Sequence, residues 1–127
     1  MKRILIVDDD RDVFESMKIV LEAEGYKVDW ATNGVEALEK AKAQKPDLMI
    51  LDVMMNTDDE GFQVTYTMKK DQGLAAVPII MVTSVGTKTG FSFDKRKDQD
   101  FLPVNEFLEK PVDPKVLIDK VRENLGH

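Results

Sequence analysis

The chain has 127 residues, 43% of them hydrophobic and 33% charged, which is typical of one soluble globular domain spanning residues 1–127. Its net charge of −6 argues against direct nucleic-acid binding through a basic surface, and the absence of cysteine excludes disulfides, thiol catalysis and thiolate metal sites. No apolar run approaches the length of a membrane span, and the amino terminus lacks the apolar region of a signal peptide. We therefore expect a cytoplasmic domain that neither inserts into membranes nor binds nucleic acid directly.

Apolar residues alternate along the chain between continuous runs, which predict buried strands, and helical spacing, which predicts amphipathic helices. The first run, from Ile4 to Val7, leads directly into the acids Asp8, Asp9 and Asp10. Strands are predicted at residues 4–7, 26–31, 48–51, 78–83 and 107–108, and helices at residues 12–24, 35–44, 62–70 and 114–125. The candidate helix caps are Asp10, Asn33 and Asp113 at amino-terminal ends and Gly25 at a carboxyl-terminal end.

Strands that alternate with helices favour an α/β fold, with a doubly wound five-stranded parallel sheet and helices on both faces. In such sheets ligands bind beyond the carboxyl ends of the strands. Asp8 and Asp9 follow the first predicted strand, Asp52 follows the third, Thr83 ends the fourth, and Lys110 follows the fifth. The function is therefore expected to reside at this one edge.

The residues at this edge form a chemically coherent set. Carboxylates about 4 Å apart repel one another by roughly 4 kcal/mol at an effective dielectric constant of about 20, so the cluster of acids lowers stability unless a cation, a nearby lysine or a helix amino terminus compensates it. Mg²⁺ prefers oxygen ligands such as the carboxylates of Asp8, Asp9 and Asp52, and Lys110 adds a second positive charge. Asp52 between two cations is suited to attack a phosphoryl group, and Thr83 is suited to donate a hydrogen bond to it. These residues predict an aspartate that accepts phosphate.

Four segments in this order resemble the receiver domain of two-component response regulators. They are "ILIVDDD" for the acidic pair, "PDLMILDVMM" for the phosphoacceptor, "PIIMVTS" for the switch hydroxyl and "FLEKPV" for the lysine. The resemblance covers nearly the whole chain and implies the strand order 2-1-3-4-5. Carried over by position, it assigns the metal site to Asp8, Asp9, Asp52 and the backbone carbonyl of Met54, the catalytic roles to Asp52, Thr83 and Lys110, and the conformational switch to Thr83 and Phe107.

The resemblance also implies a signalling function. A histidine kinase or histidine phosphotransfer protein would donate a phosphoryl group to Asp52 in the presence of Mg²⁺, as a step in a phosphorelay. The domain would then switch its binding face toward a downstream protein that the sequence does not name. We expect a monomer or a weak phosphorylation-dependent dimer. Such a domain is not an enzyme in the usual sense, although it catalyses its own phosphorylation and its own slow dephosphorylation.

Two regions depart from the usual pattern of the family. The loop after Asp52 reads "VMMNTDDEGF", without the proline that usually follows the two methionines. The segment between Thr83 and Lys110 is several residues longer than usual, has sparse apolar positions and contains Gly86, Gly90 and Pro103. We therefore expect the fourth helix to be short, displaced or disordered.

Other functions compete with this interpretation. A pseudo-receiver would dock to its partner without phosphorylation. A small aspartyl-nucleophile phosphatase, similar to the haloacid dehalogenase family, needs a second aspartate two residues after the nucleophile, a spacing that Asp8 and Asp10 have but Asp52 and Met54 do not. The stretch "TKTGFS" looks like a flavodoxin phosphate turn, but in flavodoxins that turn follows the first strand, where this chain has carboxylates.

Overall fold

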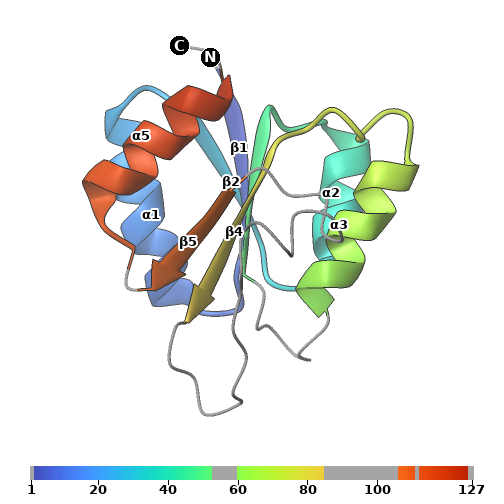
Figure 1. The fold of residues 1–127 in the computed structure, drawn as a ribbon, viewed down its shortest axis with the longest axis horizontal. Helices are drawn as coiled ribbons and strands as arrows, with labels where there is room; N and C mark the ends of the chain where they lie inside the picture. Colours follow the sequence, from blue (N-terminus) through green and yellow to red (C-terminus); the bar gives the residue numbers. More distant parts are fainter. Residues whose placement is uncertain (1, 53–59, 85–105, 111, 126–127) are drawn as a thin grey trace.

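The computed structural model describes residues 2–52, 60–84, 106–110 and 112–125, without the side chains of residues 60–62, 83, 84, 106, 107, 109 and 110. Strands and helices alternate along these residues (Figure 1). The strands are β1 (Arg3–Val7), β2 (Lys27–Ala31), β3 (Leu48–Asp52), β4 (Ile79–Ser84) and β5 (Glu106–Lys110). The helices are α1 (Arg11–Ala23), α2 (Gly34–Ala43), α3 (Glu60–Lys70) and α5 (Pro114–Leu125).

The five strands form one parallel sheet in the order β2-β1-β3-β4-β5, which confirms the predicted fold class and strand order. β1 and β3 are neighbours, with Val7 opposite Leu51, so their carboxyl ends lie next to each other. Asp52 is the last residue of β3 and is paired with Val82 on β4. This register places the acids that follow β1 beside the acid that ends β3.

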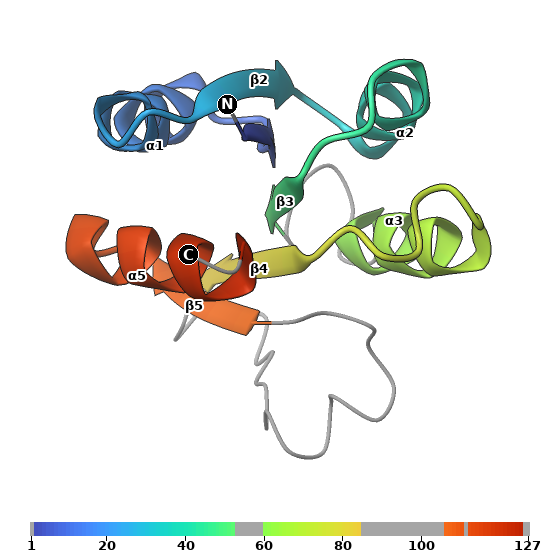
Figure 2. The same cartoon turned by 90° about the horizontal axis from the view of Figure 1, so that it is seen from above.

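Helices cover both faces of the sheet, with α1 and α5 on one face and α2 and α3 on the other (Figure 2). Alternate residues of β1 serve the two cores, because successive side chains of a strand point to opposite faces. Ile4 and Ile6 pack in the core with α1 and α5, whereas Leu5 and Val7 pack in the core with α2 and α3. Burial of each such side chain stabilises the fold by about 1.5–3 kcal/mol, so this double burial explains the continuous apolar run.

The predicted caps are present at the helix ends. The Asp10 carboxylate accepts from the backbone N–H groups of Asp12 (2.9 Å) and Val13 (3.3 Å), which caps α1. Asn33 caps α2 in the same way, and the Asp113 carboxylate accepts from the backbone N–H of Lys115 at the start of α5. Gly25 follows α1 with a φ of +91°, a left-handed conformation that glycine adopts without steric cost.

Some boundaries differ from those predicted. β5 runs from Glu106 to Lys110 rather than over two residues, because backbone pairing with β4 defines the strand even where its side chains are charged. α3 begins at Glu60, two residues earlier than predicted. The predicted irregular fourth helix falls within residues 85–105, which lie outside the described residues. None of the described helices is long and apolar enough to cross a lipid bilayer.

Candidate functional site

Three carboxylates converge at the carboxyl edge of the sheet, the lower edge in Figure 1. Asp8 and Asp9 leave the end of β1, and Asp52 ends the neighbouring β3. One carboxylate oxygen from each residue lies within 4.8 Å of the others. Asp8 is 1% exposed and Asp52 is 4% exposed, whereas Asp9 is open to solvent. The structure therefore brings together the three acids that the sequence singled out.

The backbone around Asp8 is fixed by hydrogen bonds on several sides. Its N–H donates to the carbonyl of Ala31 on β2 (3.0 Å), and its carbonyl accepts from the indole Nε1 of Trp30 (2.8 Å). Its side-chain Oδ1 accepts from the N–H of Asp10 (2.8 Å). Asp10 in turn caps α1. Hydrogen bonds of Asp10 therefore link the Asp8 carboxylate to the start of this helix.

The donor set of this cluster fits a hard divalent cation. Burial of Asp8 and Asp52 removes water that would otherwise screen the two carboxylates from each other. Repulsion between them, when both are ionised, is therefore stronger than it would be at the surface. All three side chains offer carboxylate oxygens, the ligands that Mg²⁺ prefers, and the exposure of Asp9 would leave a bound Mg²⁺ accessible to water ligands. A small hard cation bound among these oxygens would offset the repulsion.

The other predicted site residues lie partly outside the described residues. The backbones of Thr83 and Lys110 lie at the same edge, since Thr83 is paired with Glu109 and Ser84 with Lys110. The side chains of Thr83, Phe107 and Lys110, and the whole of Met54, are not among the described parts of the chain. For Thr83, Phe107 and Lys110 the structure therefore gives the backbone register alone.

Trp30 carries no functional motif in the sequence. The alternating pattern of residues 26–31 identified its strand, and an aromatic residue in such a strand reads as ordinary core. A signal was nevertheless present, because a partly buried tryptophan usually finds an acceptor for its indole N–H. That acceptor is the carbonyl of Asp8, one of the three acids.

Fold and site together define a doubly wound α/β domain with an aspartate cluster at the carboxyl ends of two central strands. Residues 4–122 match the family model of the response regulator receiver domain. Protein PilH of Pseudomonas aeruginosa is 34% identical over 126 residues, which cover 99% of each chain. The DNA-binding dual master transcriptional regulator RpaA of Synechocystis is 34% identical over 122 residues, and this chain covers 48% of its length.

Solved structures give the same result. A putative response regulator from Chloroflexus aurantiacus superposes with a TM-score of 0.85 at 29% identity, covering 99% of this chain and 98% of that one. A CheY-like receiver domain protein from Methanospirillum hungatei has a TM-score of 0.82 at 31% identity, covering 99% of this chain and 94% of that one. The chain belongs to the response regulator receiver domain family of two-component signalling.

Proposed function

We propose that Asp52 accepts a phosphoryl group from the phosphohistidine of a histidine kinase or a histidine phosphotransfer protein, with Mg²⁺ bound by Asp8, Asp9 and Asp52. The observation that carries this proposal is the meeting of three carboxylates, two of them buried, at the carboxyl edge of a receiver-family sheet. An ordinary solvated group of acids would not need to bury two of its members.

Asp52 acts as the nucleophile in this proposal. A carboxylate oxygen attacks phosphorus as the P–N bond to the donor histidine breaks, and the imidazole nitrogen keeps the bonding electron pair. When bound, Mg²⁺ neutralises part of the charge on the transferring phosphoryl oxygens. Asp8 and Asp9 hold the cation in place, and the near-complete burial of Asp52 restricts the approach of water. By its position in the family pattern, the backbone carbonyl of Met54 would be a further ligand of this cation.

Thr83, Lys110 and Phe107 complete the mechanism. The Lys110 amine pairs with the phosphoryl oxygens, and the Thr83 hydroxyl donates a hydrogen bond to one of them. The phosphoryl group adds about −1.5 to −2 charges at neutral pH, which biases an existing equilibrium of the domain. Thr83 and Phe107 then shift toward the site and change the face presented to a downstream protein. With Asp52, Lys110 and Thr83 in these roles, the domain catalyses its own phosphorylation and its own slow dephosphorylation.

The cap formed by Asp10 supports this proposal over a phosphatase. A phosphatase with Asp8 as nucleophile would need Asp10 as its second catalytic acid. The Asp10 carboxylate instead accepts from two N–H groups at the start of α1. Asp52, which has no aspartate two residues later, is the more suitable nucleophile.

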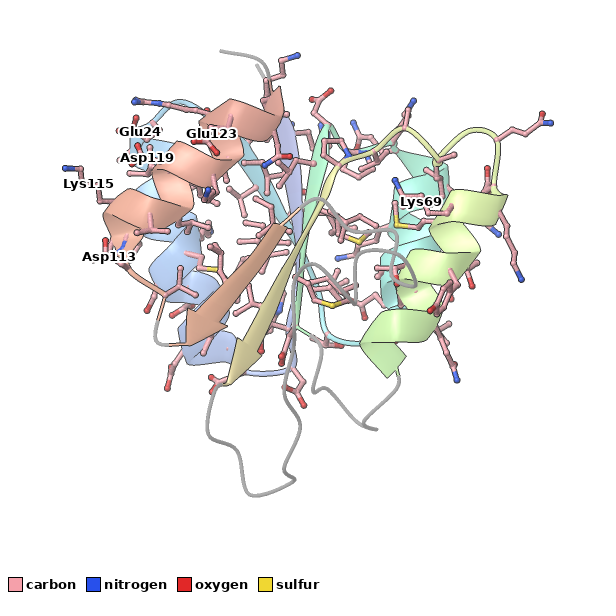
Figure 3. The ribbon with its side chains drawn as sticks, viewed as in Figure 1. Glu24, Lys69, Asp113, Lys115, Asp119 and Glu123 are labelled. Carbon is pink, nitrogen blue, oxygen red and sulfur yellow. The ribbon has the colours of Figure 1, made fainter. Side chains whose placement is uncertain are left out.

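Phosphorylation by acetyl phosphate tests the proposal. Intact-mass analysis with Mg²⁺ should show the mass of one added phosphoryl group on the native protein and none on Asp52→Asn. Asp119→Asn is a matched control, because Asp119 is an exposed acid of α5 that Figure 3 labels at the upper left, away from the lower, carboxyl edge of the sheet. It should be labelled as the native protein is. No added mass on the native protein, or undiminished labelling of Asp52→Asn, would contradict the proposal.

A pseudo-receiver would give a different pattern. A domain that docks without phosphorylation would bind its partner equally well with and without beryllofluoride, a mimic of the phosphoryl group. A receiver that uses Asp52 as a switch should bind the partner with different affinity in the two conditions.

A further inference from the structure

The single tryptophan of the chain, Trp30, contacts the backbone of Asp8, one of the three clustered acids. Trp30 belongs to β2, and its indole Nε1 donates to the backbone carbonyl of Asp8 at 2.8 Å. The face of the indole stacks on the ring of Phe14 from α1, with ring centroids 4.6 Å apart and planes 8° from parallel. The indole therefore contacts α1 through its ring face and the residue that follows β1 through its N–H.

The backbone of Trp30 also has a hydrogen-bond partner. Lys40 of α2 donates from Nζ to the Trp30 carbonyl, and the same amine lies 3.6 Å from the carboxylate of Glu36. The next residue, Ala31, accepts a hydrogen bond from the N–H of Asp8. Contacts from α1 to the ring and from α2 to the backbone, on opposite faces of the sheet, therefore fix the position from which the indole reaches Asp8.

The bonded carbonyl controls the direction in which the chain leaves β1. The carbonyl of Asp8 and the N–H of Asp9 belong to one planar peptide unit, so a hydrogen bond to this oxygen also orients Asp9. Asp8 and Asp9 both contribute to the group of three carboxylates. One indole N–H thus restrains the relative orientation of two of the three side chains.

We propose that Trp30 is a positioning residue for the metal site: its indole N–H holds the Asp8–Asp9 peptide in the orientation that binds Mg²⁺. This inference rests on the proposed function of the site. A purely structural Trp30 would stabilise the fold without affecting Mg²⁺ binding. A positioning Trp30 affects Mg²⁺ affinity through a single hydrogen bond.

Replacing the indole N–H of Trp30 by sulfur separates a purely structural role from a positioning role. Because the chain has one tryptophan, global incorporation of benzothienylalanine changes position 30 alone and replaces the indole N–H by sulfur with little change in ring shape. Incorporation of 7-azatryptophan retains the N–H and is the matched control. Calorimetric titration should show Mg²⁺ binding about 2- to 10-fold weaker in the benzothienyl protein, since one hydrogen bond to a backbone carbonyl is lost. Its melting temperature should stay within about 5 °C of that of the native protein.

Phosphorylation kinetics provide a second measurement. The Mg²⁺ concentration that gives half-maximal labelling by acetyl phosphate should rise by the same factor, while the rate at saturating Mg²⁺ stays near that of the native protein. If the benzothienyl protein does not fold, Trp30→Phe removes the N–H, keeps an aromatic ring against Phe14, and should show the same loss of Mg²⁺ affinity.

The outcomes distinguish this inference from the proposed function. Equal Mg²⁺ affinity in the native and N–H-deficient proteins would overturn the positioning role while leaving phosphorylation of Asp52 intact. Equal weakening by 7-azatryptophan would also overturn it, because the N–H is present there. A native protein that neither binds Mg²⁺ nor accepts phosphate would refute the proposed function itself.

Discussion

Acidic side chains occur toward both ends of the strands, but their surroundings differ. Toward the amino ends, the guanidinium of Arg3 pairs at 2.5 Å with Asp29, the central residue of β2, and the backbone N–H of Arg3 donates to the Asp47 carboxylate at 2.7 Å. At the carboxyl edge, Asp8, Asp9 and Asp52 face one another. Asp29 and Asp47 are each held by one residue of β1, Arg3, whereas Asp8, Asp9 and Asp52 bring three carboxylates together in a partly buried place. The first arrangement links neighbouring strands of the fold, and the second is the one to which the proposed function assigns Mg²⁺ binding.

Mg²⁺ should stabilise the protein through the carboxyl edge, and this is the largest effect that the comparison predicts. At a free Mg²⁺ concentration about 100 times its dissociation constant, the free energy of unfolding should rise by about 2.7 kcal/mol, because Mg²⁺ binds the folded state alone. Asp9→Asn should lose most of this gain because it removes one ligand charge. Chemical denaturation with Mg²⁺ or with EDTA measures both values, and the same gain in Asp9→Asn as in the native protein would place Mg²⁺ elsewhere.

Loss of the positive charge of Arg3 should have a smaller effect on the free energy of unfolding, and this effect should not depend on Mg²⁺. Arg3→Gln removes the ion pair to Asp29, whose side chain is 39% exposed, and should lower the free energy of unfolding by about 0.5–1 kcal/mol. The backbone hydrogen bond to Asp47 remains possible with any residue at this position except proline. Denaturation curves in EDTA measure the loss, and the gain on adding Mg²⁺ should equal that of the native protein. A reduced gain would show that the two groups of acids are coupled.

Most of the fold could be predicted from the sequence because burial leaves a strong pattern. The run from Ile4 to Val7 is apolar at every position, since both faces of β1 are covered by helices. The ends of β5 were missed because Glu106 and Lys110 are polar and join the strand through backbone pairing with β4. Such pairing depends on a distant segment and leaves little local signal.

Part of the candidate site could be predicted because strand ends also leave a pattern in the sequence. Acids directly after apolar runs identify strand ends, and a parallel sheet brings those ends to one edge, so Asp8, Asp9 and Asp52 were found together. Trp30 was missed because its bond to Asp8 depends on the parallel register of β1 and β2, in which Val7 lies opposite Ala31. Periodicity identifies the strand but does not give this register.

The most direct test of a shared metal site at the carboxyl edge replaces Mg²⁺ by paramagnetic Mn²⁺ and records the amide resonances of the ¹⁵N-labelled protein. The account predicts that substoichiometric Mn²⁺ broadens the amides of Asp8, Asp9 and Asp52 first, broadens those of Asp29 and Arg3 progressively less with distance from this edge, and is displaced by excess Mg²⁺. Broadening that begins at Arg3 and Asp29, or that spares Asp52 while affecting exposed acids across the surface, would contradict it.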